Sequence, residues 1–197
     1  MNNFFYGEID ANDILLDNNE LSLRLMTKRQ SLPDNIKEYE SLLKANINAK
    51  YTAKIVTVDC KSDTVILDGV LIKSNSLYKN LKGCNKGIVL CVTLGHLVDK
   101  TLLKYSFKST YEHFLVDAIY SALCESLCEL VDKKLTENYI TKNRFSVGYG
   151  DCDIEYQKSI LQIVNAEKYL SVKLSNSLLM SPTKTITAII GIENERS

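Results

Sequence analysis

The sequence lacks a net charge, because 24 lysines and arginines balance 24 aspartates and glutamates. Without a basic excess there is no electrostatic case for binding nucleic acid or an anionic membrane. No apolar run approaches the roughly 20 residues of a membrane span. The first ten residues also lack the basic and then apolar order of a signal peptide. We therefore expect a cytoplasmic protein with neither a nucleic-acid nor a membrane partner.

Metal-ligand patterns are also missing. The chain has two histidines, His96 and His113, and six scattered cysteines, none of which forms a C-x-x-C pair. Cys124 and Cys128 share a predicted helix face, but no histidine stands at a zinc-finger spacing from them. We expect free thiols in a reducing compartment and no metal site. The cysteines are Cys60, Cys84, Cys91, Cys124, Cys128 and Cys152.

The composition is that of a folded soluble domain. The 197 residues are 45% hydrophobic and 24% charged, which is ordinary for a globular chain with a real core. We expect an N-terminal segment, residues 1–33, packed on a body formed by residues 34–197.

Helical periodicity occurs in several stretches, the longest of which carries apolar residues from Phe114 to Val131 at helical spacing. Near the N-terminus, Asp10 or Asn12 caps a short helix that ends near Leu16, before the polar residues 17–19. Further helices are expected at 34–48, 75–81, 96–105 and 109–136, and from Asp151 or Asp153 to about Asn165.

Strand patterns occur in pairs. Residues 51–59 and 64–72 predict a hairpin with Gly69 as a bulge, and the apolar run 87–95 predicts a strand buried on both faces. Residues 174–180 and 185–192 predict two more strands, joined by the polar residues 181–184. Paired strands favour an α+β single domain with a central, mainly antiparallel sheet and packed helices over a parallel doubly wound fold. The Gly-x-Gly-x-x-Gly motif that follows the first strand of a Rossmann-type methyltransferase is also missing, which argues against that class.

The stretch from Arg144 to Asp151 is the densest in ligand-binding groups. Arg144 offers a planar fork of donors for a carboxylate or phosphate, and Tyr149 offers a flat ring. Gly148 and Gly150 let the backbone approach a ligand closely. The alternative is a strand that ends in a glycine-flanked turn, with Arg144 as an ordinary surface charge.

A polar stripe on the long helix allows two interpretations. Asp117, Ser121 and Glu125 recur at i, i+4 and i+8, and such a stripe is usually a solvated face. The alternative is a single carboxylate, Glu125, that faces a cavity. His96, at the start of its helix, either faces a cavity or caps a turn.

These patterns together resemble a known family. The helix from Asp117 to Glu129, the element Arg144-x-Ser146-x-Gly148-Tyr149, the run 178–182 and Thr185-x-Thr187 resemble the activation (reactivation) domain of cobalamin-dependent methionine synthase. The stretch 91–99 also fits. The resemblance covers roughly residues 34–192 and is closest to stand-alone bacterial forms of the domain.

The resemblance implies binding of S-adenosylmethionine. Arg144 would bind the methionine carboxylate, and Glu125 would hold the amino group or favour the sulfonium. Backbone at Arg144, Ser146 and Gly148 would contact the adenine and ribose, and Tyr149 would pack on the ligand. The family has alanine at the position of Ser146 and histidine at that of Glu155. Its N-terminal acidic ligand and C-terminal tyrosine have no identified counterpart here.

The implied function is that of an accessory subunit, not catalytic alone, in the reductive remethylation of cob(II)alamin. The chain has no Asp-x-His-x-x-Gly motif, so cobalamin would come on a methionine synthase partner subunit, with electrons from a flavodoxin-like or other donor. One alternative is a free-standing S-adenosylmethionine-dependent enzyme, with His96 or Glu155 as its base. Others are a non-catalytic S-adenosylmethionine-binding regulatory module and an accessory protein of another corrinoid methyltransferase.

Overall fold

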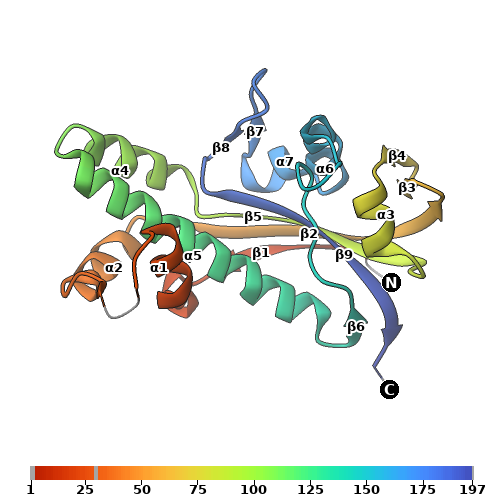
Figure 1. Ribbon diagram of the computed structural model, residues 1–197, viewed down its shortest axis with the longest axis horizontal. Helices are drawn as coiled ribbons and strands as arrows, with labels where there is room; N and C mark the ends of the chain where they lie inside the picture. The colour runs from red at the N-terminus through yellow and green to blue at the C-terminus, as the bar shows by residue number, and fades with distance from the viewer. Residues whose placement is uncertain (1–2, 29–30, 197) are drawn as a thin grey trace.

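The computed structural model describes residues 3–28 and 31–196, and its centre is a seven-stranded sheet (Figure 1). The strand order is β4-β3-β2-β5-β9-β6, with β1 paired to β2, and every pair is antiparallel. This confirms the predicted α+β class and excludes the parallel alternative. The strands are β1 (Phe4–Ile9), β2 (Ala49–Lys61), β3 (Thr64–Leu67), β4 (Val70–Lys73), β5 (Lys86–Thr93), β6 (Tyr139–Thr141) and β9 (Thr185–Glu195).

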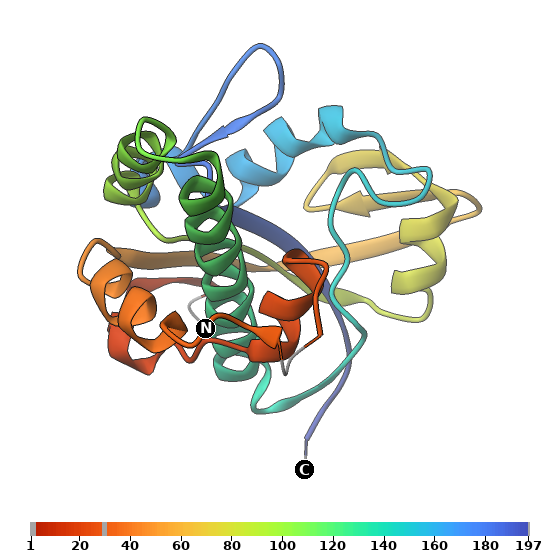
Figure 2. The same ribbon diagram turned by 60° about the vertical axis from the view of Figure 1, so that its left-hand side comes forward.

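Helices cover both faces of the sheet (Figures 1 and 2). One core cluster joins α1 (Asn18–Arg24), α2 (Ile36–Lys44), α4 (His96–Ser106) and α5 (Thr110–Thr136) to one face. The other cluster joins α3 (Asn75–Leu81), α6 (Gln157–Ile163) and α7 (Ala166–Leu170) to the opposite face. A two-stranded hairpin of β7 (Lys173–Leu174) and β8 (Met180–Ser181) projects beside α7.

The central strand β5 carries the core on both sides, as its unbroken apolar run predicts. Ile88 and Leu90 face the α5 side, whereas Val89 and Cys91 face the α6 side. All four are 0–1% exposed. Burial on both faces explains why this strand shows no alternation in sequence.

Helix α5 runs along the sheet with its predicted apolar stripe inward. Ser109 caps it by accepting a hydrogen bond from the Glu112 backbone N–H. Ile119, Leu123 and Leu127 are fully buried. Phe114 was expected on this face but is 49% exposed, because at this turn of α5 the neighbouring Leu115 and Val116 take the buried positions.

Two strand predictions are wrong. The run 64–72 is not one strand with a bulge, because Asp68 and Gly69 both take positive φ and reverse the chain between β3 and β4. An Asp-Gly pair between apolar residues is the usual signal for this turn. The run 174–180 is not one strand either, since Leu174 and Met180 pair with each other and residues 175–179 form the tip of the β7–β8 hairpin.

Helix boundaries near the N-terminus also differ. Residues Ala11–Asp13 form only a 3₁₀ turn, capped by Asp10. The sequence predicts that the polar stretch 17–19 ends a helix. It instead starts α1, because the Asp17 carboxylate accepts a hydrogen bond from Asn19 N. Within the described residues, no helix is long and apolar enough to cross a membrane.

Candidate functional site

Four of the five predicted site residues, Glu125, Arg144, Ser146 and Tyr149, line one cavity of about 380 Å³. Gly148 is not part of the lining but lies between Ser146 and Tyr149 in the loop that forms one wall. The remaining lining residues come from α5, from the loop after β6, from η3 (Ile154–Tyr156) and α6, and from β8 and β9. They are Cys128, Val147, Ile154, Gln157, Met180, Thr185, Ile186, Thr187 and Ala188.

The predicted binding stretch first runs alongside β9 and then turns away from it. Phe145 and Ile189 exchange backbone hydrogen bonds of 2.7 and 2.9 Å, which continue the pairing of β9 beyond β6. The chain then turns: Tyr149 N donates to Ser146 O, and Gly148 N donates to Cys152 O at 2.9 Å. Gly148 has φ of 88° and Gly150 has φ of 59°. The pairing with β9 therefore ends in a glycine turn that lies beside the cavity, and ligand binding by this stretch stays a prediction.

Asp151 does not cap the helix that follows it. Its carboxylate accepts hydrogen bonds from Ser74 Oγ at 2.7 Å, Asn75 N at 2.9 Å and Ser76 N at 2.9 Å, so it sits at the N-terminus of α3. These hydrogen bonds, with the Ser76 backbone N–H first, lower the pKa of the Asp151 carboxyl. Asp153 caps the following turn, η3, as predicted. The cavity loop is therefore tied to a second element.

One end of the cavity is closed by short hydrogen bonds, and we call Ser146, Gln157 and Thr187 the hydrogen-bonded end. Ser146 Oγ donates to the Thr187 carbonyl at 2.7 Å. The Gln157 amide and the Thr187 hydroxyl bond reciprocally at 3.0 and 3.1 Å, and both residues are buried. Sequence reasoning did not identify Gln157 as a site residue. A lone glutamine at a helix start gives no signal without its threonine partner.

A second group of residues at the cavity holds longer ion pairs. Arg144 Nε lies 3.5 Å from Asp132 Oδ2, and Arg24 lies 3.5 Å from Glu125 Oε1. We call Glu125, Arg144 and their partners Arg24 and Asp132 the charged end. Burial raises the pKa of the Asp132 carboxyl, and Arg144 opposes that rise.

A buried thiol lies beside Arg144 in the cavity lining. Cys128 lines the cavity and is 0% exposed. Burial raises the pKa of its thiol to about 11, although the nearby Arg144 guanidinium opposes the rise. The thiol is therefore neutral near pH 7 and is an apolar wall rather than a nucleophile.

The rest of the polar stripe on α5 is bound by a lysine, although the Asp117 side chain stays 46% exposed. Lys184 Nζ donates to Asp117 Oδ1 and to Ser121 Oγ, each at 2.7 Å. The Lys184 side chain is only 13% exposed. This lysine comes from the polar connection before β9, which the sequence predicted to border a site. A smaller cavity of about 150 Å³, lined by Arg24, Ser121, Glu125 and Lys184 among others, shares Glu125, Thr185 and Ile186 with the main one.

His96 and Glu155 lie outside the cavity lining. The His96 Nε2 atom is 3.3 Å from the Ser171 carbonyl oxygen, which fits the turn-capping interpretation. Glu155 is exposed in η3. Among the described residues, no group of three histidine, cysteine, aspartate or glutamate side chains is placed to hold a metal ion.

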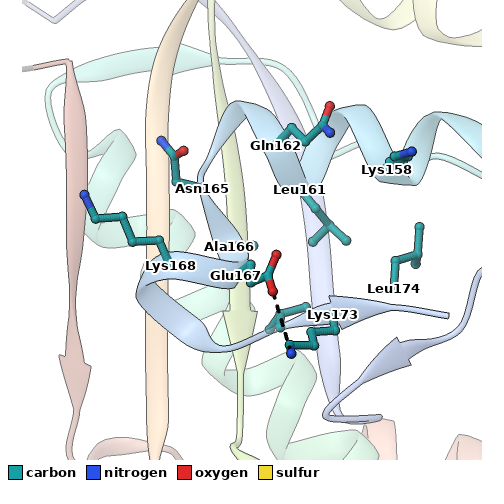
Figure 3. Close-up of a pocket in the computed structure, with 10 residues that line it drawn as sticks. Lys158, Leu161, Gln162, Asn165, Ala166, Glu167, Lys168, Lys173 and Leu174 are labelled. Carbon is teal, nitrogen blue, oxygen red and sulfur yellow. Dashed lines mark ion pairs between the residues drawn. The ribbon is translucent and has the colours of Figure 1, made fainter.

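A larger cavity of about 640 Å³ lies elsewhere, between α6, α7 and β7 (Figure 3). Leu161 and Leu174 point into it, and Lys158 lies near its edge. Lys173 pairs with Glu167 across 3.7 Å. None of the predicted site residues lines this groove, and its charged groups are exposed side chains. The cavity of about 380 Å³, on which partly buried polar groups converge, is therefore the candidate site.

Comparisons with known proteins place the fold. No family model and no curated protein matches the sequence. Among solved structures, the chain is similar to a crystal structure of the MetH reactivation domain bound to AdoHcy, with a TM-score of 0.73. That match covers 95% of this chain and 78% of the other, at 13% sequence identity. The likeness confirms the fold that the sequence resemblance implied.

Proposed function

We propose that this chain binds S-adenosylmethionine in the 380 Å³ cavity and acts as an accessory subunit for the reductive remethylation of cobalamin. The observation that carries the proposal is the convergence of Glu125, Arg144, Ser146 and Tyr149 on one cavity. These residues are separated by up to 24 positions in the sequence, and the sequence resemblance alone predicts them as site residues. The fold supports the proposal, because its structural neighbour holds AdoHcy.

The chemistry of the cavity suits this ligand. S-adenosylmethionine carries a carboxylate, an ammonium, a sulfonium and a flat purine. Arg144 provides a fork of donors for the carboxylate, and Glu125 provides an anion for the ammonium and sulfonium. Tyr149 is 65% exposed and offers a ring face for the purine. The backbone turn at Gly148 allows a close approach to the ribose and adenine.

The accessory role is favoured over an independent enzyme by the position of the two candidate bases. Neither His96 nor Glu155 lines the cavity, and its Cys128 thiol is protonated near pH 7. In the proposed reaction this chain orients the sulfonium methyl group. Cobalamin on a methionine synthase partner subunit supplies the methyl acceptor, and a flavodoxin-like donor supplies one electron.

The test is calorimetric titration with S-adenosylmethionine. Arg144→Ala should weaken binding by about 1.5–3 kcal/mol, the size of a hydrogen bond to a charged group. Arg196→Ala, at the end of the chain and outside the cavity lining, is the matched control and should bind like the wild type. If the wild type does not bind, the proposal fails. If it binds, methyl transfer that needs both a cobalamin protein and an electron donor supports the accessory role, whereas binding without transfer favours a regulatory module.

A further inference from the structure

The N-terminal helix α1 brings a cation to the candidate site from outside the region of family resemblance. Leu21 is fully buried in the core beneath α1. Arg24 follows it by three positions, and its guanidinium reaches Glu125 on α5 at 3.5 Å. The Arg24 side chain also pairs with Glu20 at 2.7 Å, one helical turn earlier. Because Leu21 fixes the position of α1, Arg24 stays beside Glu125.

Two cations therefore interact with the same carboxylate. Glu125 pairs with Arg24, and its charge also acts on the Arg144 guanidinium. A third cation, Lys184, lines the adjoining 150 Å³ cavity but is already paired with Asp117 at 2.7 Å. Of the two cations beside Glu125, Arg24 is the one that the proposed function assigns no ligand group.

Such a cation weakens the attraction of the site for positive charge. At the charged end, the negative potential of Glu125 is partly cancelled by a guanidinium 3.5 Å away. S-adenosylmethionine carries a sulfonium that S-adenosylhomocysteine lacks, and the two ligands are otherwise nearly identical. A change in potential at this end therefore alters the affinity of the first ligand more than that of the second.

We propose that Arg24 is a specificity-determining residue that lowers the preference of this site for S-adenosylmethionine over S-adenosylhomocysteine. This inference rests on the proposed function. Arg24 acts through its charge on Glu125 rather than by touching the ligand. The site then responds to the ratio of the two ligands instead of retaining only the charged one.

The experiment measures both ligands against three variants by calorimetry. Arg24→Gln removes the charge and should raise the ratio of the two dissociation constants, thioether over sulfonium, by about two- to fivefold, as for a partly exposed ion pair. Arg24→Lys keeps the charge and should leave the ratio near the wild-type value. The Arg24→Gln effect should shrink in 1 M salt, where charges are screened within about 3 Å.

Glu20→Gln provides a second, independent change. It removes the charged partner that lies nearer to Arg24, so the guanidinium then pairs with Glu125 only. Its charge cancels more of the negative potential of Glu125, and the ratio of the two dissociation constants should fall. If both ligands bind the wild type but the ratio in Arg24→Gln stays constant or falls, this inference is overturned and Arg24 instead positions Glu125. If neither ligand binds the wild type, the proposed function itself fails, and the inference fails with it.

Discussion

The two ends of the cavity hold their polar groups in different ways. At the hydrogen-bonded end, Ser146, Gln157 and Thr187 make bonds of 2.7 to 3.1 Å, and both Gln157 and Thr187 are buried. At the charged end, Arg144 pairs with Asp132 and Glu125 pairs with Arg24, each across 3.5 Å. The Arg144 and Glu125 side chains are 31% and 39% exposed. The side chains of the hydrogen-bonded end are fixed by one another, so we also call it the fixed end. The charged end keeps charges that can exchange partners.

The difference separates structure from recognition. Buried hydrogen bonds are costly to break, so the fixed end determines the shape of the cavity. Partly exposed ion pairs contribute about 0–1 kcal/mol each, so a ligand can replace them with little loss. We therefore expect substitutions at the fixed end to act on stability and substitutions at the charged end to act on binding.

The largest stability effect is expected at Gly150, which precedes the Asp151 that binds the N-terminus of α3 and lies close to Ser76. An added Cβ would lie 2.4 Å from Ser76 Oγ and 2.9 Å from Ser76 Cβ, at a φ of +59°. Gly150→Ala should lower the free energy of unfolding by about 2–4 kcal/mol, since overpacking and a positive φ both oppose it. Urea denaturation measures the loss.

Gly69→Ala is the matched control for this substitution. Gly69 has φ of +85°, but nothing lies within 4 Å of an added Cβ. It should lose only about 1 kcal/mol, from the backbone conformation alone. Equal losses for the two variants would show that Ser76 moves away from the added methyl group at little cost, which would contradict the overpacking argument.

The next largest stability effect is expected at the buried pair of Gln157 and Thr187. Gln157→Leu or Thr187→Val should each cost about 1–3 kcal/mol, because each leaves a buried polar partner unsatisfied. The double variant should cost clearly less than the sum, since it removes both polar groups together. Denaturant titration of all four proteins gives the coupling energy. Additive losses would mean that the two side chains do not depend on each other.

Periodicity was enough to predict much of the fold. The apolar run of β5, the long stripe of α5 and the Ser74–Gly83 region around α3 all have local signals, and all are in the structure. The hairpin turn at Asp68 and Gly69 also had a local signal, but the apolar residues on either side made the run look continuous. The helix α1 was missed because Asp17 is both a polar breaker and an N-cap, and the sequence alone does not separate the two roles.

The candidate site depended on more than local pattern. The family resemblance selected Glu125, Arg144, Ser146 and Tyr149, and the fold brings them to one cavity. Their partners were not predictable, because each comes from a distant segment. Asp151 reaches back 75 to 77 positions to the start of α3, and Arg24 reaches 101 positions to Glu125. No spacing rule links such pairs before the chain is folded.

The smallest expected effects are opposite pH trends at two aspartates. At Asp151, in the loop that follows Tyr149, hydrogen bonds from the N-terminus of α3 lower the carboxyl pKa. Its contribution to stability is therefore present above the unfolded pKa of about 3.9 and is lost as the pH falls through the folded value. At Asp132, in the charged end, burial raises the carboxyl pKa. Its contribution is present below the unfolded pKa and is lost as the pH rises through the folded value.

Asp151→Asn and Asp132→Asn convert these trends into a measurement, because asparagine keeps the side-chain shape and cannot ionise. Thermal unfolding of the wild type and both variants between pH 2 and pH 7 gives two difference curves. The deficit of Asp151→Asn relative to the wild type should be greatest near neutral pH and should shrink in acid. Asp132→Asn should instead improve relative to the wild type as the pH rises from 3 to 6, since the wild type must then bury a charge beside Arg144. Parallel curves would mean that the two carboxylates share one environment, and the contrast between the fixed and the charged end would then be wrong.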